Sequence, residues 1–394
     1  MNYEKLFAER TKNMGANIIR EILKVVSQPG MISLAGGIPA PQSMPLNLIR
    51  DLVDSALTKY GARALQYDLT EGFIPLREVL VSHLQNKGIM TRVEDVCISS
   101  GSQGVLDALG KVLINPGDHI AVEAPTYLGA ISAFNPYGPR YACIAMDEEG
   151  IIPEALEKVI ATHPVKFVYL VPTFQNPTGR SLSLARRHVI AEIIAKNDLL
   201  LVEDDPYSDL RYRGEPLPTL QSMIPDHVLY TTTLSKVFAP GLRIGVYIAP
   251  EPVKRWLVLA KQGIDLHSST FNQALAAEYI LGGHLQQQIP KIVALYKPRQ
   301  EAMLQAMDQY FPSSYTYSKP EGGMFIWAEG PKGDDTEKLY WKCVERHAAY
   351  VPGKFFYPKC EEGLATMRLN YTMSNEEEIE KAIHIIADVL KEGL

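Results

Sequence analysis

Seven short runs of β-forming residues, separated by stretches with helical periodicity, constrain the fold of this chain more than any other feature. The runs are Val96–Ser99, Ile120–Glu123, Tyr141–Met146, Phe167–Val171, Leu199–Glu203, Val228–Thr232 and Ile244–Ile248. Several are apolar throughout instead of alternating, which is typical of strands covered on both faces. The pattern predicts an α/β fold with a mostly parallel, seven-stranded sheet covered by helices.

The chain has 394 residues, more than one hydrophobic core usually serves. Helical stretches follow Pro252 as far as about Phe311, and short strands and two further helices come after them. We therefore expect a second, smaller α+β domain. The expected division is an N-terminal arm that belongs partly to the small domain (1–45), a large domain (46–288) and a small C-terminal domain (289–394).

The last helix has the clearest signals. Ser374 and Glu377 have the spacing of a capping box, which predicts the start of the helix. Apolar residues then recur at helical spacing at Ile379, Ala382, Ile383, Ile386 and Leu390. They predict one buried face.

Composition excludes several classes of partner. The net charge is −6 and no run of Lys and Arg occurs, which argues against nucleic-acid binding. The four cysteines are widely spaced, so neither a metal site nor a disulfide framework is expected. No signal peptide and no apolar run of membrane-spanning length is found. We expect a cytoplasmic protein that binds small molecules, without a membrane partner.

Chemistry-bearing residues follow the predicted strands, where open α/β sheets bind their ligands. Lys236 comes soon after a buried strand, with hydroxyls beside it and Arg243 downstream, a set that suits an anion such as phosphate. Asp204 ends another apolar strand, and the phenol of Tyr207 lies nearby. For the Lys236 segment alone, an ordinary polar loop is an equally good interpretation, and for the Asp204 segment an acidic loop at a strand end is the commoner one.

Three more strand ends carry similar signals. The segment 99–104 leads into a helix whose first amides could bind an anion. Tyr127 follows a second strand, and the Asn176-Pro177-Thr178-Gly179 turn follows a third. Together, the five segments bring an anion cradle, an aromatic ring, an amide, an acid with a phenol, and a lysine to one rim of the sheet.

In their order along the chain, these motifs resemble those of the fold-type I enzymes that depend on pyridoxal 5'-phosphate, and in particular the class I/II aminotransferases. The resemblance spans essentially the whole chain and includes the late Arg368. It is strongest to the 2-aminoadipate/kynurenine aminotransferase branch. The segments that carry it are 35–41, 65–67, 173–179 and 322–325.

The resemblance implies a role for each cofactor residue. Lys236 matches the lysine that bonds to the cofactor and then carries the substrate proton, and Asp204 matches the acid that keeps the ring nitrogen protonated. Asp205 is then expected to be a solvated neighbour. Tyr207 and Asn176 match the groups that hydrogen-bond the ring oxygen. The remaining matches are the stacking residue Tyr127 and the phosphate ligands Ser102, Gln103, Thr233, Ser235 and Arg243.

The same resemblance implies substrate and partner contacts. Tyr67 matches a phosphate-binding tyrosine that comes from a neighbouring subunit, so we expect a homodimer with shared active sites. Arg368 matches the arginine that binds the substrate α-carboxylate. Gly37 falls in a loop that covers the substrate. Arg20 lies in a segment that reads the distal group of the substrate in some relatives, although an exposed helix arginine is an equally good interpretation.

The resemblance implies an aminotransferase with a ping-pong mechanism. It would move an amino group from an L-amino acid (2-aminoadipate, kynurenine, aromatic or branched-chain) to a 2-oxo acid such as 2-oxoglutarate. One alternative is a pyridoxal-phosphate-dependent β-lyase that cleaves a C–S bond. Another is an aminotransferase-like transcription regulator, against which we count the acidic net charge and the early start of the aminotransferase pattern.

Overall fold

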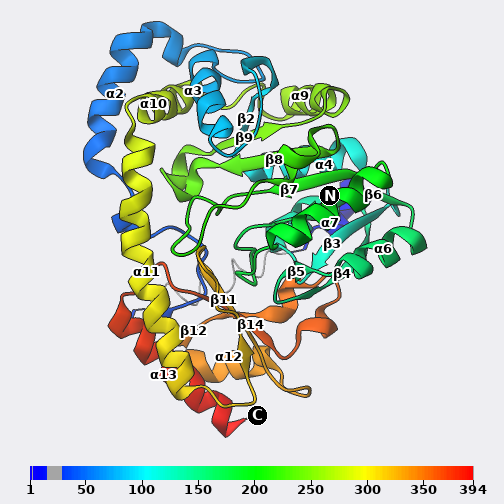
Figure 1. Cartoon of the computed structure of the whole chain (residues 1–394), viewed down its shortest axis with the longest axis vertical. Helices are drawn as coiled ribbons and strands as arrows, with labels where there is room; N and C mark the ends of the chain where they lie inside the picture. The colour runs from blue at the N-terminus through cyan, green and yellow to red at the C-terminus, as the bar shows by residue number, and fades with distance from the viewer. Residues whose placement is uncertain (2, 16–28, 394) are drawn as a thin grey trace.

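The computed structural model describes residues 1, 3–15 and 29–393. A large α/β layer occupies the upper half of Figure 1, and a smaller unit lies below it. All seven predicted strands of the large sheet form. They are β2 (Cys97–Ser100), β3 (His119–Ala124), β4 (Arg140–Asp147), β6 (Val165–Leu170), β7 (Leu200–Asp204), β8 (Val228–Thr233) and β9 (Ile244–Ile248).

The large sheet has the strand order β2-β9-β8-β7-β6-β3-β4-β5. Its centre is parallel, as predicted, and β9 runs antiparallel to both β8 and β2. The predicted number of strands was one too low, because β5 (Gly150–Ile151) adds an edge strand antiparallel to β4. Two residues are too few to leave a recognisable run in the sequence.

Helices cover this sheet and bury its strands on both faces. Strands β8 and β9, for example, are buried at every residue. The helices of the large layer are α2 (Leu46–Tyr60), α3 (Ile74–Gln85), α4 (Ser102–Leu113), α5 (Leu128–Phe134), α6 (Pro153–Thr162), α7 (Leu184–Lys196), α8 (Leu220–Met223), α9 (Glu251–Asp265) and α10 (Thr270–Leu281). Of these, α10 packs against α2 and α3 at the top of Figure 1.

The long helix α11 (His284–Tyr310) runs from the large layer down to the small unit, where it packs against α13 (Glu376–Glu392). The expected boundary at residue 288 therefore falls inside one continuous helix. The small unit is built on an antiparallel sheet with the order β10-β11-β14-β13. Its elements are β10 (Thr316–Tyr317), β11 (Phe325–Glu329), α12 (Thr336–Glu345), β13 (Val351–Pro352) and β14 (Thr366–Asn370).

A segment near the N-terminus joins the small unit. Strand β1 (Ile32–Ser33) pairs in parallel with β12 (Ala348–Ala349), and Leu34 continues the contact by donating to Ala349 O (2.7 Å) and accepting from Asn370 N (2.7 Å). The chain therefore reaches the rim of the large sheet from the small unit at the segment that follows Leu34.

The capping box of α13 lies one residue later than predicted. The side chain of Asn375, instead of Ser374, accepts from the backbone N–H of Glu378 (2.9 Å), and the Glu378 carboxylate, instead of Glu377, accepts from Asn375 N (3.0 Å). Both registers offer an N-cap residue with Glu three positions on, and the buried Ser374 leaves Asn375 as the cap. The predicted apolar face of this helix is buried.

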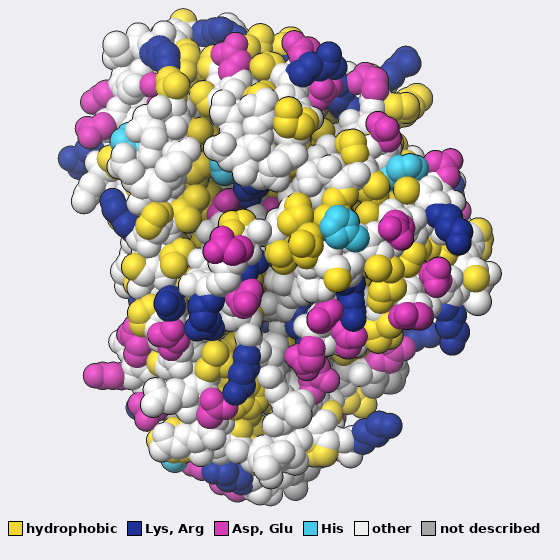
Figure 2. Space-filling model, viewed as in Figure 1, with side chains coloured by type: hydrophobic (Ala, Val, Ile, Leu, Met, Phe, Trp, Pro, Cys, Tyr) yellow, Lys and Arg dark blue, Asp and Glu magenta, His cyan; other side chains and the backbone are white. Residues whose placement is uncertain are grey.

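Within the described part of the chain, none of the helices has the length and apolar character needed to cross a membrane. Among the same residues there is no group of three or more His, Cys, Asp or Glu side chains that could hold a metal ion. Acidic and basic side chains are interspersed over the face that Figure 2 shows.

Candidate active site

A cavity of about 530 Å³ opens at the carboxyl ends of the parallel strands. Because β9 is antiparallel to β8, its first residues lie at the same edge as the ends of β2, β3, β6, β7 and β8. The cavity is lined by ten of the predicted site residues. They are Ser102, Gln103, Tyr127, Asn176, Asp204, Tyr207, Thr233, Ser235, Lys236 and Arg243.

Lys236 ends a single helical turn (Leu234–Lys236) that follows β8 directly. Its Nζ donates to Gly37 O (3.1 Å). Burial lowers the pKa of the amine to about 8, and the nearby cations of Arg243 and Arg368 act in the same direction, while Asp204 opposes them. A neutral amine is therefore accessible near neutral pH.

Asp204 is the last residue of β7 and only 2% exposed. One carboxylate oxygen, Oδ2, accepts from Tyr169 Oη (2.8 Å), while the buried Oδ1 has no partner. Burial raises the pKa of this carboxyl to about 7, and the neighbouring Asp205 adds to the shift. An unsatisfied buried acceptor is costly, so Oδ1 is suited to a cationic N–H donor in the cavity.

Asp205 is not the solvated neighbour that was expected, because it is only 3% exposed. Its Oδ2 accepts from Tyr230 Oη (2.8 Å) and Ser208 Oγ (2.6 Å), and it lies 3.6 Å from Lys87 Nζ. Although burial opposes ionisation, Lys87 and the two hydroxyls outweigh it and lower the pKa of Asp205. A cation from the turn that follows α3 thus allows this second acid to be buried.

Asn176 connects two other predicted site residues, Tyr207 and Arg368. Its Nδ2 donates to Tyr207 Oη (3.4 Å), and its Oδ1 accepts from Arg368 Nη1 (2.9 Å). Tyr127 lies across the cavity as the residue before α5, and burial raises its pKa to about 12. A Cβ at Gly129 would lie 2.3 Å from the Tyr127 ring, so the position of the ring requires glycine there.

The phosphate ligands expected from the sequence surround the start of α4. The first turn offers free backbone N–H groups and the positive end of the helix dipole, a suitable place for an anion. Arg243 adopts a left-handed backbone (φ 55°), and its Nη2 donates to Ser100 O (3.4 Å). A Cβ at Gly101, which also has positive φ (77°), would lie 2.3 Å from that Nη2. Close approach of the guanidinium to this loop therefore depends on glycine.

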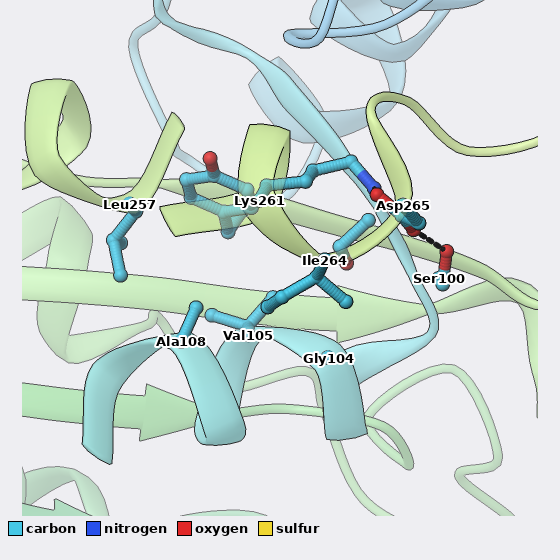
Figure 3. Close-up of a pocket in the computed structure, with 10 residues that line it drawn as sticks. Ser100, Gly104, Val105, Ala108, Leu257, Lys261, Ile264 and Asp265 are labelled. Atoms are coloured by element: carbon cyan, nitrogen blue, oxygen red, sulfur yellow. Dashed lines mark hydrogen bonds and ion pairs between the residues drawn. The ribbon is translucent and has the colours of Figure 1, made fainter. Parts of the chain in front are cut away.

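A small cavity of about 50 Å³ lies behind this loop, between α4 and α9 (Figure 3). Asp265 accepts a hydrogen bond from Ser100 Oγ (2.5 Å), as Figure 3 shows, and pairs with Lys261 Nζ (2.7 Å). The other residues that line this small cavity are mainly apolar and include Val105 and Ile264. The hydrogen bond from Ser100 to Asp265 holds the loop before α4 against α9.

Arg368 lies on β14 and is 2% exposed. Besides Asn176, its guanidinium donates to Ala35 O (2.8 Å), and it stacks over the rings of Phe325 (4.4 Å) and Phe356 (4.9 Å). Burial lowers its pKa to about 10. The Nε atom is buried without a partner. Arg368 is therefore fixed behind Asn176, at the junction of the small unit and the cavity.

Three of the predicted residues that the structure describes do not line the cavity: Gly37, Tyr67 and Arg368. Gly37 contributes its carbonyl to Lys236 but does not line the cavity. Tyr67 is 77% exposed, packs edge-on against His267 (5.7 Å between ring centroids) and does not line the cavity of its own chain. Arg20 lies outside the described residues.

Sequence reasoning missed several residues of the site. Tyr169, which holds Asp204, is a tyrosine inside an apolar strand, and its hydroxyl there needs a partner. The need of a buried tyrosine hydroxyl for a hydrogen-bond partner was the signal in the sequence that could have identified Tyr169. Other residues that line the cavity have no chemical signature in the sequence; they include Ile38, Leu128, Pro206 and Pro240.

Known proteins resemble this chain over its whole length. The family model described as aminotransferase class I and II matches residues 42–386. An aromatic-amino-acid aminotransferase from Thermococcus litoralis is 44% identical, over 100% of this chain and 96% of the relative. The solved kynurenine aminotransferase from Pyrococcus horikoshii is 42% identical with a TM-score of 0.95, over 99% and 98% of the two chains. The α-aminoadipate aminotransferase from Thermus thermophilus, solved with N-(5'-phosphopyridoxyl)-L-leucine, is 35% identical with a TM-score of 0.92, over 100% and 99%.

These relatives confirm the resemblance that the motifs predicted, and they favour neither the β-lyase nor the regulator. The class I and II aminotransferases use pyridoxal 5'-phosphate and act on amino acids and 2-oxo acids. The chain therefore belongs to the aminotransferase class I and II family and is an aminotransferase.

Proposed function

We propose that the chain binds pyridoxal 5'-phosphate in the 530 Å³ cavity and transfers an amino group from an L-amino acid to a 2-oxo acid such as 2-oxoglutarate. The observation that carries this proposal is the unpartnered, buried Oδ1 of Asp204 in the same cavity as the amine of Lys236. When bound, the cofactor withdraws electrons from the substrate Cα and carries the amino group between two half-reactions.

The residues present fit each part of the cofactor. Asp204 Oδ1 would accept from the ring N–H, and Asn176 and Tyr207 would hydrogen-bond the ring oxygen. Tyr127 would cover the face of the ring. The phosphate would be held by Ser102, Gln103, Thr233, Ser235 and Arg243.

Lys236 would bond to the cofactor and then act as the general base and acid at the substrate Cα. Its lowered pKa of about 8 keeps a fraction of the amine neutral, as a base requires, and leaves the conjugate acid strong enough to return the proton. Arg368 would bind the α-carboxylate through its planar fork and so orient Cα toward that amine.

The most direct test is spectroscopic. Protein reconstituted with pyridoxal 5'-phosphate should absorb in the visible, lose that absorption with an amino donor and regain it with a 2-oxo acid. Lys236→Ala should show no such cycle. Wild-type protein that stays colourless after reconstitution would contradict the proposal.

We propose aromatic amino acids, kynurenine, 2-aminoadipate and branched-chain amino acids as donors. The names of the relatives support the first three, and the apolar wall formed by Ile38, Leu128, Pro206 and Pro240 supports apolar side chains. For 2-aminoadipate, Arg20 is proposed to bind the distal carboxylate. Arg20→Ala should lower kcat/KM for 2-aminoadipate about tenfold or more and leave that for phenylalanine unchanged. Equal values for wild type and variant on 2-aminoadipate would remove Arg20 from the site.

We also propose a homodimer in which Tyr67 of each chain binds the phosphate in its partner. Tyr67 is exposed and does not line the cavity of its own chain, which supports this assignment. Sedimentation should give a dimer. Tyr67→Phe should weaken cofactor binding without dissociating the dimer.

We propose a division into a large domain (46–288) and a small domain (289–394) that residues 1–45 partly join. The β1–β12 pairing supports this division.

A further inference from the structure

Two buried tyrosine–aspartate pairs lie at the end of β7. Tyr169 of β6 is the register partner of Val202, and its Oη donates to Asp204, two residues further on (2.8 Å). Tyr230 of β8 pairs with Glu203, and its Oη donates to Asp205, again two residues further on (2.8 Å). Because successive residues of a strand point to opposite faces, the two pairs lie on opposite faces of the sheet.

The two carboxylates differ in what else they contact. Asp205 accepts from Ser208 N (3.2 Å) and Ser208 Oγ (2.6 Å) as well as from Tyr230, and Lys87 lies beside it. Asp204 has a single donor, Tyr169, although it is equally buried. The orientation of the Asp204 carboxylate therefore depends on Tyr169 far more than that of Asp205 depends on Tyr230.

We infer that Tyr169 is a positioning residue for the reaction: its hydroxyl holds Oδ2 of Asp204, so that Oδ1 is presented, ionised, to the ring nitrogen of the cofactor. This inference rests on the proposed function. Tyr169 does not line the cavity, so it would act only through Asp204.

The physical argument concerns the charge on Asp204. The phenol of Tyr169 is itself kept protonated, since burial raises its pKa well above the usual value, and so it remains a donor. A hydrogen bond to the ionised carboxylate stabilises that form against the cost of burial. Without it, the balance among the remaining groups shifts toward neutral Asp204, because Asp205 disfavours the charge and only Lys236 favours it.

The test compares Tyr169→Phe with Tyr230→Phe in the reconstituted enzyme. Both variants remove one hydroxyl of a fully buried tyrosine that donates to an aspartate over 2.8 Å. The readouts are the dissociation constant for pyridoxal 5'-phosphate, the ¹⁵N chemical shift of cofactor labelled at the ring nitrogen, and urea unfolding.

We expect Tyr169→Phe to weaken cofactor binding by roughly tenfold and to move the ring-nitrogen shift toward the unprotonated value. Tyr230→Phe should keep both readouts at the wild-type values while it loses comparable stability. Equal cofactor readouts in Tyr169→Phe and wild type, or equal changes in both variants, would overturn the inference. Absence of cofactor binding by the wild type would instead refute the proposed function.

A second measurement covers the case in which Tyr169→Phe does not fold. A fluorinated tyrosine incorporated at position 169 has a more acidic phenol and donates a stronger hydrogen bond. It should move the ring-nitrogen shift toward the protonated value, the opposite direction to Tyr169→Phe. An unchanged shift would count against the inference.

Discussion

Strand β7 separates two clusters that contain the same three residue types. The cavity cluster is Lys236, Asp204 and Tyr169, and the far-face cluster is Lys87, Asp205 and Tyr230. In the far-face cluster, Lys87 lies 3.6 Å from Asp205 and 3.0 Å from Asp209. Despite burial, these carboxylates raise the pKa of Lys87, and the lysine in turn helps to lower that of Asp205.

The cavity cluster is shifted the other way. Burial lowers the pKa of Lys236 to about 8 and raises that of Asp204 to about 7, so both groups move toward their neutral forms. Neither group has an ion-pair partner within 4 Å among the described residues. The same residue types therefore stabilise the fold where lysine and aspartate form an ion pair. Where they form none, their pKa values shift toward neutral pH, as is typical of catalytic groups.

The largest expected effect is on activity. Lys236→Ala should lower kcat by ~10⁴-fold or more, because under the proposed function it would remove both the bond to the cofactor and the proton carrier. Its free energy of unfolding, measured in urea without cofactor, should stay within about 1 kcal/mol of wild type, since no paired charge is broken. A large loss of stability would mean that Lys236 also has a structural role.

The far-face lysine should behave in the opposite way. Lys87→Met leaves the buried carboxylate of Asp205 without its cation and should lower the free energy of unfolding by about 3–5 kcal/mol. The visible absorption of the reconstituted enzyme should persist. The double variant Lys87→Met/Asp205→Asn should recover part of the loss; if it is no more stable than Lys87→Met alone, the pair does not act as described.

The smallest effect is a difference in pH dependence between the two acids. The folded pKa of Asp204, about 7, lies above the unfolded value of roughly 4, so the folded state binds the extra proton and loses stability as pH rises through that window. Asp204→Asn should therefore gain stability relative to wild type between roughly pH 4 and pH 7.

Asp205 should show the opposite sign. Its folded pKa is lowered, so its contribution is present above the unfolded pKa and is lost as pH falls through the folded value. The destabilisation caused by Asp205→Asn should be greatest at neutral pH and shrink below roughly pH 4. Urea unfolding of cofactor-free protein across this range measures both; parallel pH profiles for the two variants would contradict the comparison.

The large sheet and its rim were predictable from the sequence because short apolar runs and the polar residues that follow them are local signals. Asp205 was misjudged because its partner, Lys87, lies in a turn more than a hundred residues away in sequence. Strands of two residues, such as β1 and β12, exist only through pairing with distant segments. The role of Tyr169 depends on the register of β6 against β7, which no local pattern encodes.

The segment that follows β1 bridges the two halves of the molecule at a fixed spacing. Arg368 of the small unit donates to Ala35 O, and Lys236 of the large sheet donates to Gly37 O. Two residues can span at most about 7 Å, so the carbonyls cannot move far apart. Residues 35–37 thus limit how far one sheet can move against the other. A displacement larger than the length of this segment must break the hydrogen bond from Lys236 to Gly37 or the one from Arg368 to Ala35.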